Sequence, residues 1–541
     1  MYIKKCSPDD CPKLAQFNKQ LIEDEGSDNP MNTDELQKRM YDFIKINGGY
    51  QAVYFIEADI IVGYALVKTT SLPYYLRQFF ICREFRRKGS GRLAFSKLLE
   101  YLGVNVIDIE VLSRNTAGIA FWKSLGFEDR SNYMRFEKKE SKIVENKPTK
   151  HIYLDSAATT RPSNEVIASH PDVMINSYAN PDSMHALGLD AEKIVGHARE
   201  IIASSVNAKS GEIIFTSSGT EANNLAIFGA VEALKRKGNK IITTDSEHPS
   251  VYMPMRELEK RGFEVVRLST KGGKINIDEF KCSLDDKVIL ISVMLVNNET
   301  GCIYALPEIV KTVENAGLRD KFYGGTPYIH CDAVQAFSKI PVDLNKLKID
   351  MTSISAHKIH GLKGTGALFL RKGVRIVPQI FGGGQENNMR SSTLNTPGIF
   401  AFGKAVEENV RDFQKNSEYI NSLYDYAVLK IKEKCPDVMF NQEKAIGEYS
   451  KYILSLRLPN VRSEVMLNYL SSRCIYISSG SACSAKRQNS HEAKRVLINY
   501  GLDKNSADFT VRVSFSKYNN ICEIDEFADA LSDGIKKLAV Y

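Results

Sequence analysis

Apolar and polar positions follow two different patterns along the chain. Before about residue 138, apolar-rich runs over Gln51–Ala58 and Ile60–Thr69 predict two strands of a hairpin around Asp59. Further runs predict three more strands, and helical spacing of apolar residues predicts two helices. The strands are Tyr75–Ile81, Val106–Leu112 and Tyr133–Lys138, and the helices are Arg92–Leu102 and Ala117–Leu125. We therefore expect a small mixed α/β domain.

After about residue 150, the strand-like runs are short and continuously apolar instead. They are Ile213–Thr216, Lys240–Thr244, Glu264–Leu268, Val288–Val296, Tyr328–Asp332 and Met351–Ser355. Such runs are typical of strands that are buried on both faces of a mainly parallel sheet. Helical patterns such as Glu221–Lys235 lie between them. The pattern predicts a doubly wound α/β domain, with its sites at the carboxyl ends of the strands.

The sequence also predicts where the domains begin and end. The stretch from Lys138 to Lys150 is charged and contains a proline, which is typical of a linker. The tail from about residue 410 alternates less and predicts a smaller α+β domain. The predicted parts are therefore residues 1–138, a linker 139–150, a large domain 151–409 and a small domain 410–541.

Charge and cysteine content narrow the possible classes of protein. A net charge of +7 over 541 residues, without a long basic run, is a weak argument for nucleic acid. We expect no direct nucleic-acid partner and, since no window offers about 20 apolar residues, no membrane span. The ten cysteines form no Cys-x-x-Cys pair, so no metal site is predicted. Without a signal sequence at the start, the prediction is a cytoplasmic protein.

Chemically useful side chains follow the predicted strands of the second region. Ser217–Asn224 begins a helix with small residues, which suits a phosphate but is also common in helix caps. His248, Asn298, Asp332 and Lys358 each follow another strand. Taken singly, His248 and Lys358 are better explained as a structural histidine and a surface lysine at a strand end. Together they match what pyridoxal 5'-phosphate needs, namely an amide cradle, an acid for the ring nitrogen, a stacking group and a Schiff-base lysine.

Ordered motifs extend this match across residues 151–541, which resemble a cysteine desulfurase of the iron–sulfur-assembly type. This group belongs to the class-V aminotransferase family of fold-type I pyridoxal phosphate enzymes. The motifs are Tyr153–Thr160, Asn180–His185, Phe215–Asn224, Val296–Gly301, His357–Lys358, Gly382–Thr393, Ser478–Cys483 and Val511–Phe515. The resemblance implies that L-cysteine is converted to L-alanine and that the sulfur passes to an acceptor, a protein or a small molecule.

The family pattern also implies a role for individual residues. Lys358 holds the cofactor as a Schiff base and moves the substrate α-proton, Asp332 pairs with the ring nitrogen, and Gln335 binds the ring hydroxyl. His248 stacks on the ring and takes part in acid–base steps. The phosphate is held by Gly219, Thr220, Ser355, His357 and, from the neighbouring subunit of a homodimer, Thr393. Asn298, beside the cofactor, and Arg512 hold the substrate, Arg512 by a bidentate grip on its carboxylate.

Cys483 separates a desulfurase from an ordinary aminotransferase. Only a thiolate attacks the sulfur of the substrate and keeps it as a persulfide. The flanks Ser-Ser-Gly-Ser-Ala are small, as a thiol that moves between substrate and acceptor requires. The segment after it is more basic and longer than the family pattern. It includes His491, which either tunes the thiol or is simply solvated.

The N-terminal region has its own ligand-binding pattern. A basic turn with two glycines, Arg86–Gly91, joins a strand to a helix, which suits a pyrophosphate but also fits an unliganded turn. With Asn115 and Ala120–Phe127, residues 1–138 resemble the GNAT family of acyl-CoA-dependent N-acetyltransferases. The resemblance implies acetyl-CoA as cosubstrate. Its expected binding residues are Arg87, Lys88, Gly89, Ser90, Gly91 and Arg92 at the pyrophosphate, and Asn115 and Phe121 along the pantetheine arm.

Three readings of the whole chain remain open from the sequence. The first is a bifunctional desulfurase and acetyltransferase, whose acceptor amine the sequence does not identify. Tyr133 is a candidate general acid and Glu110 a candidate base, although either is equally well a structural sheet residue. The second makes the N-terminal domain a non-catalytic module that recruits the sulfur acceptor. The third keeps pyridoxal phosphate but replaces cysteine by selenocysteine or another amino acid.

Overall fold

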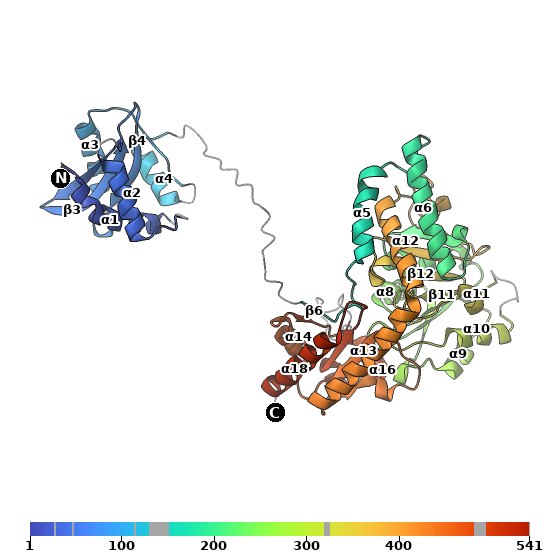
Figure 1. Ribbon diagram of the computed structural model, residues 1–541. Helices are drawn as coiled ribbons and strands as arrows, with labels where there is room; N and C mark the ends of the chain where they lie inside the picture. Colours follow the sequence, from blue (N-terminus) through green and yellow to red (C-terminus); the bar gives the residue numbers. More distant parts are fainter. Residues whose placement is uncertain are drawn as a thin grey trace. The chain divides into compact units, whose positions relative to one another are not determined.

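The chain folds into two units, Met1–Lys142 and Ile143–Tyr541 (Figure 1). The structure is a computed structural model that describes residues 1–25, 29–45, 48–112, 115–128, 151–318, 325–480 and 494–539. Among these residues, no helix combines the length and the apolar character that crossing a bilayer requires.

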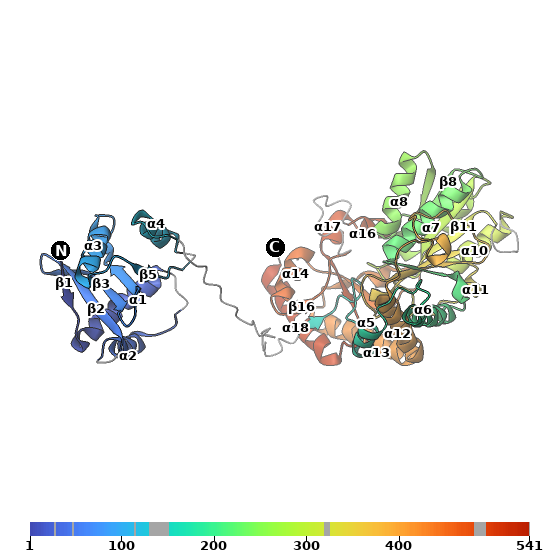
Figure 2. The same ribbon diagram turned by 90° about the horizontal axis from the view of Figure 1, so that it is seen from above.

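The first unit is built on a sheet that has, within its described residues, five strands in the order β1-β2-β3-β4-β5. Helices α1 and α2 cover one face of the sheet, and α3 lies on the other (Figure 2). The strands are β1 Tyr2–Lys5, β2 Tyr50–Glu57, β3 Ile60–Lys68, β4 Tyr74–Ile81 and β5 Ile107–Ile109, and the helices are α1 Cys11–Asp24, α2 Thr33–Ile44, α3 Ser90–Leu102 and α4 Thr116–Ser124.

The hairpin predicted around Asp59 is present. Ala58 and Asp59 have φ values of 48° and 62°, the backbone of a tight two-residue turn between β2 and β3. The predicted strand Val106–Leu112 is shorter than expected, because Val106 and Leu112 are 61% and 40% exposed and lie outside β5. The predicted strand Tyr133–Lys138 lies outside the described residues.

The second unit contains a larger sheet, with seven strands in the part of the chain described. Their order is β7-β13-β12-β11-β10-β8-β9, and all pairs are parallel except those of β13. The strands are β7 Ile213–Thr216, β8 Lys240–Thr244, β9 Glu264–Leu268, β10 Val288–Met294, β11 Tyr328–Asp332, β12 Met351–Ser355 and β13 Gly366–Leu370. The predicted doubly wound, mainly parallel architecture is therefore confirmed.

Helices cover both faces of this sheet, which explains the continuous apolar runs. Ile241 of β8 packs with helices α7 and α8, whereas its neighbour Ile242 packs in the core on the opposite face. Helix α12 packs along α6 and α5 (Figure 1). The helices of this part are α5 Asn164–Asn176, α6 Ala186–Ser205, α7 Gly219–Leu234, α8 Pro249–Lys260, α9 Ile277–Ser283, α10 Leu306–Asn315, α11 Leu344–Leu347 and α12 Thr396–Arg411.

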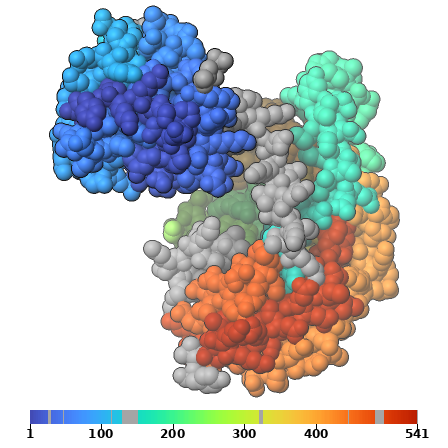
Figure 3. Space-filling view, turned by 60° about the vertical axis from the view of Figure 1, so that its left-hand side comes forward, coloured from blue at the N-terminus to red at the C-terminus, as the bar shows by residue number. Residues whose placement is uncertain are grey.

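The C-terminal segment has a separate apolar core. Its elements are β14 Met439–Phe440, β15 Ile453–Arg457, β16 Ile475–Tyr476 and β17 Thr510–Ser514, with α13 Phe413–Lys434, α14 Ser463–Ser471, α16 Arg495–Tyr500, α17 Lys504–Asp508 and α18 Ile521–Leu538. Its orange and red atoms form a continuous surface (Figure 3). Strand β6, Ile152–Tyr153, pairs with β16, so the start of the second unit packs into this core. The predicted boundaries at 138, 150 and 409 stay predictions.

Candidate active site

The carboxyl ends of adjacent parallel strands bring the predicted residues together. In the register of the sheet, Asp332 at the end of β11 lies between Met294 of β10 and Ser353 of β12. Lys358 ends a short 3-10 helix, Ala356–Lys358, that directly follows β12. His248 caps the N-terminus of α8 just after β8. These positions form one edge of the sheet, where doubly wound folds place their ligands.

The amine of Lys358 is held at this edge by backbone carbonyls. Its Nζ donates to the carbonyl oxygens of Ala157 at 2.6 Å and Ala158 at 2.7 Å. The N–H of Ala157 in turn donates to Ser514 Oγ of β17 at 2.9 Å. Strand β17 therefore helps to fix the carbonyls that orient the lysine.

Asp332 is a buried carboxylate with two donors. The N–H of Val334 donates to Oδ1 at 3.0 Å, and Asn223 Nδ2 donates to Oδ2 at 2.8 Å. Burial raises the pKa of Asp332, and these two hydrogen bonds oppose the rise. A protonated pyridine nitrogen would supply the positive charge that this carboxylate lacks among its hydrogen-bond partners.

His248 is linked to that carboxylate through two side chains. Its Nδ1 accepts from the N–H of Ser250 at 3.1 Å and lies 2.7 Å from Ser250 Oγ. Asn223 Nδ2 donates to Ser250 Oγ as well as to Asp332. Burial, and then the charge of Lys358, lower the pKa of His248 to about 4, so its ring is neutral at pH 7. Asn223 was not singled out from the sequence, although it lies in the quoted motif after β7.

The predicted phosphate cradle contains an unused hydroxyl. Gly219 and Thr220 form the first turn of α7, and Ser355 Oγ is buried without a hydrogen-bond partner. A Cβ added to Gly366 would lie 2.9 Å from the Gly219 nitrogen, so only a glycine lets β13 approach this turn so closely. The free amides of a helix N-terminus and an unpaired hydroxyl fit an anionic phosphate.

The other predicted phosphate residues lie near this turn. His357 Nδ1 lies 3.1 Å from Thr159 Oγ1, and burial lowers the pKa of His357 to about 3. The exposed Thr393 lines a hollow of about 150 Å³ together with Thr216 and Ser217 at the end of β7. Its expected reach to a neighbouring subunit stays a prediction.

The predicted substrate residues contact each other. Arg512 of β17 donates through Nη1 to the carbonyl of Asn298 at 2.8 Å and through Nη2 to Asp155 Oδ1 at 2.6 Å. The Arg512 side chain is only 3% exposed, and Asn298 Oδ1 is buried without a partner. Asp155 was not predicted. It balances the arginine charge, and a substrate carboxylate would share or displace it.

Cys483 and His491 lie outside the described residues, but described residues before and after them in the sequence contact the site. Ser478 and Arg512 exchange backbone hydrogen bonds, N to O, of 3.0 and 2.6 Å. Beyond the segment, Arg495 donates to the carbonyls of Asp245 and Glu247, next to His248. The described residues Ser478 and Arg495, on either side of Cys483 in the sequence, therefore lie beside predicted substrate and cofactor residues.

The N-terminal unit brings several of its predicted residues together. Gly89 caps α3 with a φ of 84°, in the left-handed region that favours glycine. A Cβ added to Gly91 would lie 3.2 Å from the ring of Phe121. Asn115 caps α4 by accepting from Gly118 N at 2.8 Å, and Glu110 accepts from Tyr75 OH at 3.1 Å. The other predicted pyrophosphate residues, Arg87, Lys88, Ser90 and Arg92, lie in this turn and at the start of α3. Tyr133 lies outside the described residues.

Comparisons with known proteins agree with this geometry. Residues 152–527 match the family model of class-V aminotransferases, and residues 14–144 match that of the GNAT acetyltransferase domain. The chain is 37% identical over 398 residues to the cysteine desulfurase IscS of Dictyoglomus turgidum, which covers 72% of this chain and 95% of that relative. It is 38% identical over 395 residues to the mitosomal cysteine desulfurase of Trachipleistophora hominis, covering 72% and 86%.

Solved structures give the same result. A NifS-like protein superposes with a TM-score of 0.65 at 32% identity, covering 72% of this chain and all of that one. A NifS-like protein from Rickettsia africae gives a TM-score of 0.62 at 28% identity, with the same coverage. Both resemblances predicted from the sequence are confirmed. The chain belongs to the cysteine desulfurase family of class-V aminotransferases and carries a GNAT acetyltransferase domain ahead of it.

Proposed function

We propose that the second unit converts L-cysteine to L-alanine and leaves the sulfur as a persulfide on Cys483. The main support for the proposal is the position of the Lys358 amine. Two backbone carbonyls hold it at the carboxyl edge of the sheet, where the buried Asp332 also lies. Pyridoxal phosphate, bound there, supplies an electron sink next to the substrate α-carbon.

The residues of this chain divide the work of binding and proton transfer. Lys358 binds the cofactor covalently and moves the substrate α-proton, since its amine is poised at the strand end. His248 would lie against the ring of the cofactor, and its neutral imidazole would exchange protons through Nε2, because Nδ1 already accepts from Ser250. Asp332 would pair with the ring nitrogen of the cofactor and keep it protonated, and Gln335 would donate to its ring oxygen. Gly219, Thr220, Ser355, His357 and a partner's Thr393 bind the phosphate.

Substrate binding and sulfur transfer use Asn298, which follows β10, together with Arg512 and Cys483 of the C-terminal segment. Arg512 and Asn298 hold the substrate carboxylate, which takes over donors that Asp155 occupies in this structure. The thiolate of Cys483 attacks the substrate sulfur, so that the S–S bond of a persulfide forms and the C–S bond of the substrate breaks. The electron pair of the C–S bond stays on the three-carbon skeleton, which takes up a proton at that carbon and is released as alanine. Cys474, half-buried and next to β16, is the next candidate nucleophile.

The proposal is tested by incubating the purified protein with L-cysteine and analysing products and protein by mass spectrometry. We expect alanine in solution and one added sulfur atom on the peptide that contains Cys483. The matched control is Cys483→Ser, which keeps cofactor binding and removes the sulfur acceptor. Alanine without a modified Cys483 peptide would contradict the assigned nucleophile, and the same test with selenocysteine checks the alternative substrate.

For the first unit, we propose acetyl transfer from acetyl-CoA to an amine. The close approach of Gly91 to Phe121 and the left-handed Gly89 at the start of α3 support a coenzyme A site there. Calorimetric titration with acetyl-CoA, followed by thiol release with a panel of amines, tests the proposal. Binding without turnover of any amine would favour the module that recruits a sulfur acceptor.

Assembly and location complete the proposal. A homodimer would let Thr393 of each chain reach the phosphate of the other, and light scattering on the purified protein measures this directly. We also propose a cytoplasmic site of action, where thiols stay reduced. The sulfur acceptor itself is to be identified by transfer from the persulfide form to candidate acceptors.

A further inference from the structure

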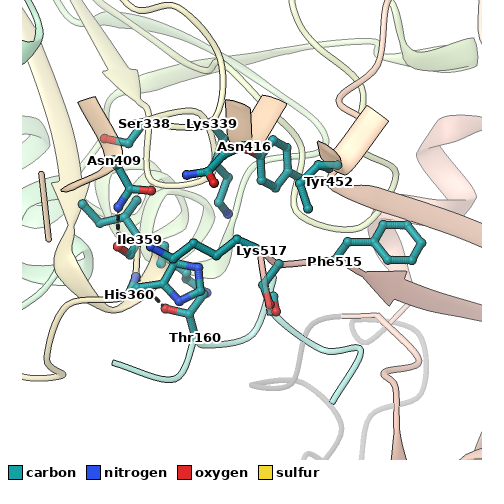
Figure 4. A pocket seen from close by; sticks show the side chains of 14 residues that line it. Thr160, Ser338, Lys339, Ile359, His360, Asn409, Asn416, Tyr452, Phe515 and Lys517 are labelled. Atoms are coloured by element: carbon teal, nitrogen blue, oxygen red, sulfur yellow. Dashed lines mark hydrogen bonds between the residues drawn. The ribbon is translucent and has the colours of Figure 1, made fainter. Parts of the chain in front are cut away.

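A buried lysine lies next to the candidate site and has no role in the scheme above. Lys339, which follows β11, is only 8% exposed. It lines a pocket of about 20 Å³ together with Lys358, and Figure 4 shows it among the side chains of Asn416 and Tyr452. Its Nζ lies 5.9 Å from the centre of the Tyr452 ring. Among the described residues, no carboxylate lies within ion-pair distance of this amine.

Burying a lysine without a carboxylate partner costs free energy, so the hydrogen bond that this lysine makes indicates what its role is. Lys339 Nζ donates to Gln335 Oε1 at 3.0 Å. Burial, and then the charges of Lys358 and Arg512, lower the pKa of Lys339 to about 7. Both the charged and the neutral amine carry N–H groups, so the donation to Gln335 persists through this titration.

The other end of the Gln335 carboxamide is also held. Its Nε2 donates to the carbonyl oxygen of Ala157 at 2.8 Å. A carbonyl oxygen only accepts, so the amide nitrogen must face Ala157 and the amide oxygen must face Lys339. The same Ala157 oxygen accepts from Lys358 Nζ, a contact that changes when Lys358 binds the cofactor. Lys339 and Ala157 therefore hold the two ends of the Gln335 carboxamide, and of these two contacts only that of Lys339 sets the position of the amide oxygen.

We propose that Lys339 is a positioning residue, which turns the Gln335 carboxamide so that its second N–H faces the ring oxygen of pyridoxal phosphate. The inference rests on the proposed function, because it needs the cofactor beside Gln335. An N–H donated to that oxygen stabilises its anionic form. The pocket therefore lowers the pH at which the cofactor bound to Lys358 changes its visible absorption. Without Lys339, only the Ala157 carbonyl still holds the amide, so the amide rotates more easily and presents its oxygen, which repels the anion, part of the time.

The test is a pH titration of the visible absorption band in the cofactor-loaded full chain. Lys339→Met, which is similar in length and has no donor, should raise the apparent pKa of the band by about one unit, a tenfold change in proton affinity. Lys339→Arg keeps the donors and should stay closer to the wild type. Lys346→Met, the same change at an exposed lysine of α11, is the matched control and should leave the band unchanged.

A double-mutant cycle separates positioning from the simple loss of a positive charge. In a Gln335→Ala background, Lys339→Met should cause no further shift, because its effect passes through Gln335. Equal shifts in both backgrounds would overturn the proposal in favour of direct electrostatics. An unchanged band in Lys339→Met would overturn it as well.

Cofactor affinity of the apo-protein gives a second readout that does not depend on turnover. Titration of pyridoxal phosphate into apo-protein, followed by the same band, should show weaker binding for Lys339→Met and for Gln335→Ala, and no additional loss in the double variant. A wild-type protein that never develops the band would overturn the proposed function together with this inference. A normal band with unaltered affinity and titration in Lys339→Met overturns the inference alone.

Discussion

A buried histidine in the middle of the large sheet makes stability sensitive to mild acid. His330 lies on β11 with no exposed surface, and its Nδ1 and Nε2 lie 2.8 Å from Ser292 Oγ and 3.1 Å from Ser353 Oγ on the two flanking strands. Burial lowers the pKa of His330 from 6.5 to about 3. The unfolded chain therefore binds this proton first as the pH falls. The stabilisation of the folded state by the neutral, buried His330 is intact above pH 6.5 and is lost progressively between pH 6.5 and about 3.

The size of the effect follows from the shift. Each pH unit below 6.5 lowers the free energy of unfolding by about 1.4 kcal/mol for one such group. The decrease from pH 6.5 to pH 5 is therefore about 2 kcal/mol. For a unit of this length, that corresponds to a decrease of about 2 to 3 °C in Tm. Burial raises the pKa of Glu247 to about 8, and this group acts in the opposite direction over the same interval. Comparing the wild type with a variant changed only at His330 cancels the contributions that both proteins share, including that of Glu247.

The assay is differential scanning calorimetry at pH 7 and pH 5 for the wild type and His330→Gln. The glutamine amide can donate to one serine and accept from the other, but it does not titrate. The decrease in Tm between the two pH values should be about 2 to 3 °C smaller in the variant, whatever its stability at pH 7. The exposed His151, changed to Gln, is the control and should behave like the wild type. An equal decrease in wild type and His330→Gln would refute the reasoning.

Four further predictions concern the two proposed sites. Lys358→Ala should lose the visible band and all desulfuration, and normal turnover would refute its role. Cys483→Ser should keep the band but release no sulfide from L-cysteine, whereas near-normal release would place the nucleophile elsewhere. Arg512→Met should lower kcat/KM for L-cysteine by at least about 100-fold, since two charge-assisted hydrogen bonds to the substrate are lost, and a smaller loss argues against a bidentate grip. Gly91→Leu should block acetyl-CoA in calorimetric titration, because its side chain meets the Phe121 ring, and should leave sulfide release intact; loss of both would show coupled sites.

Local pattern was sufficient to predict several elements of the fold. The runs over Ile213–Thr216 and Lys240–Thr244 coincide with β7 and β8, because strands covered on both faces need apolar side chains at consecutive positions. The run over Glu264–Leu268 coincides with β9, although this edge strand is only partly buried. The turn at Asp59 is also a local feature, because Ala58 and Asp59 form a two-residue turn between strands that are adjacent in the sequence. Strand β13 was not predicted, since its antiparallel place between β7 and β12 depends on partners distant in the chain.

The sequence by itself determined which chemical groups stand at the strand ends, because position after a strand fixes the edge of the sheet where a side chain emerges. Only the tertiary structure decided how those groups pair. Asp155 neutralises Arg512, 357 residues away, and Ala157 accepts from both Lys358 and Gln335. Such contacts depend on packing between distant segments, and their hydrogen bonds form because burial removes water as the competing partner. The same burial keeps His248 and His330 neutral, which no local pattern of residues specifies.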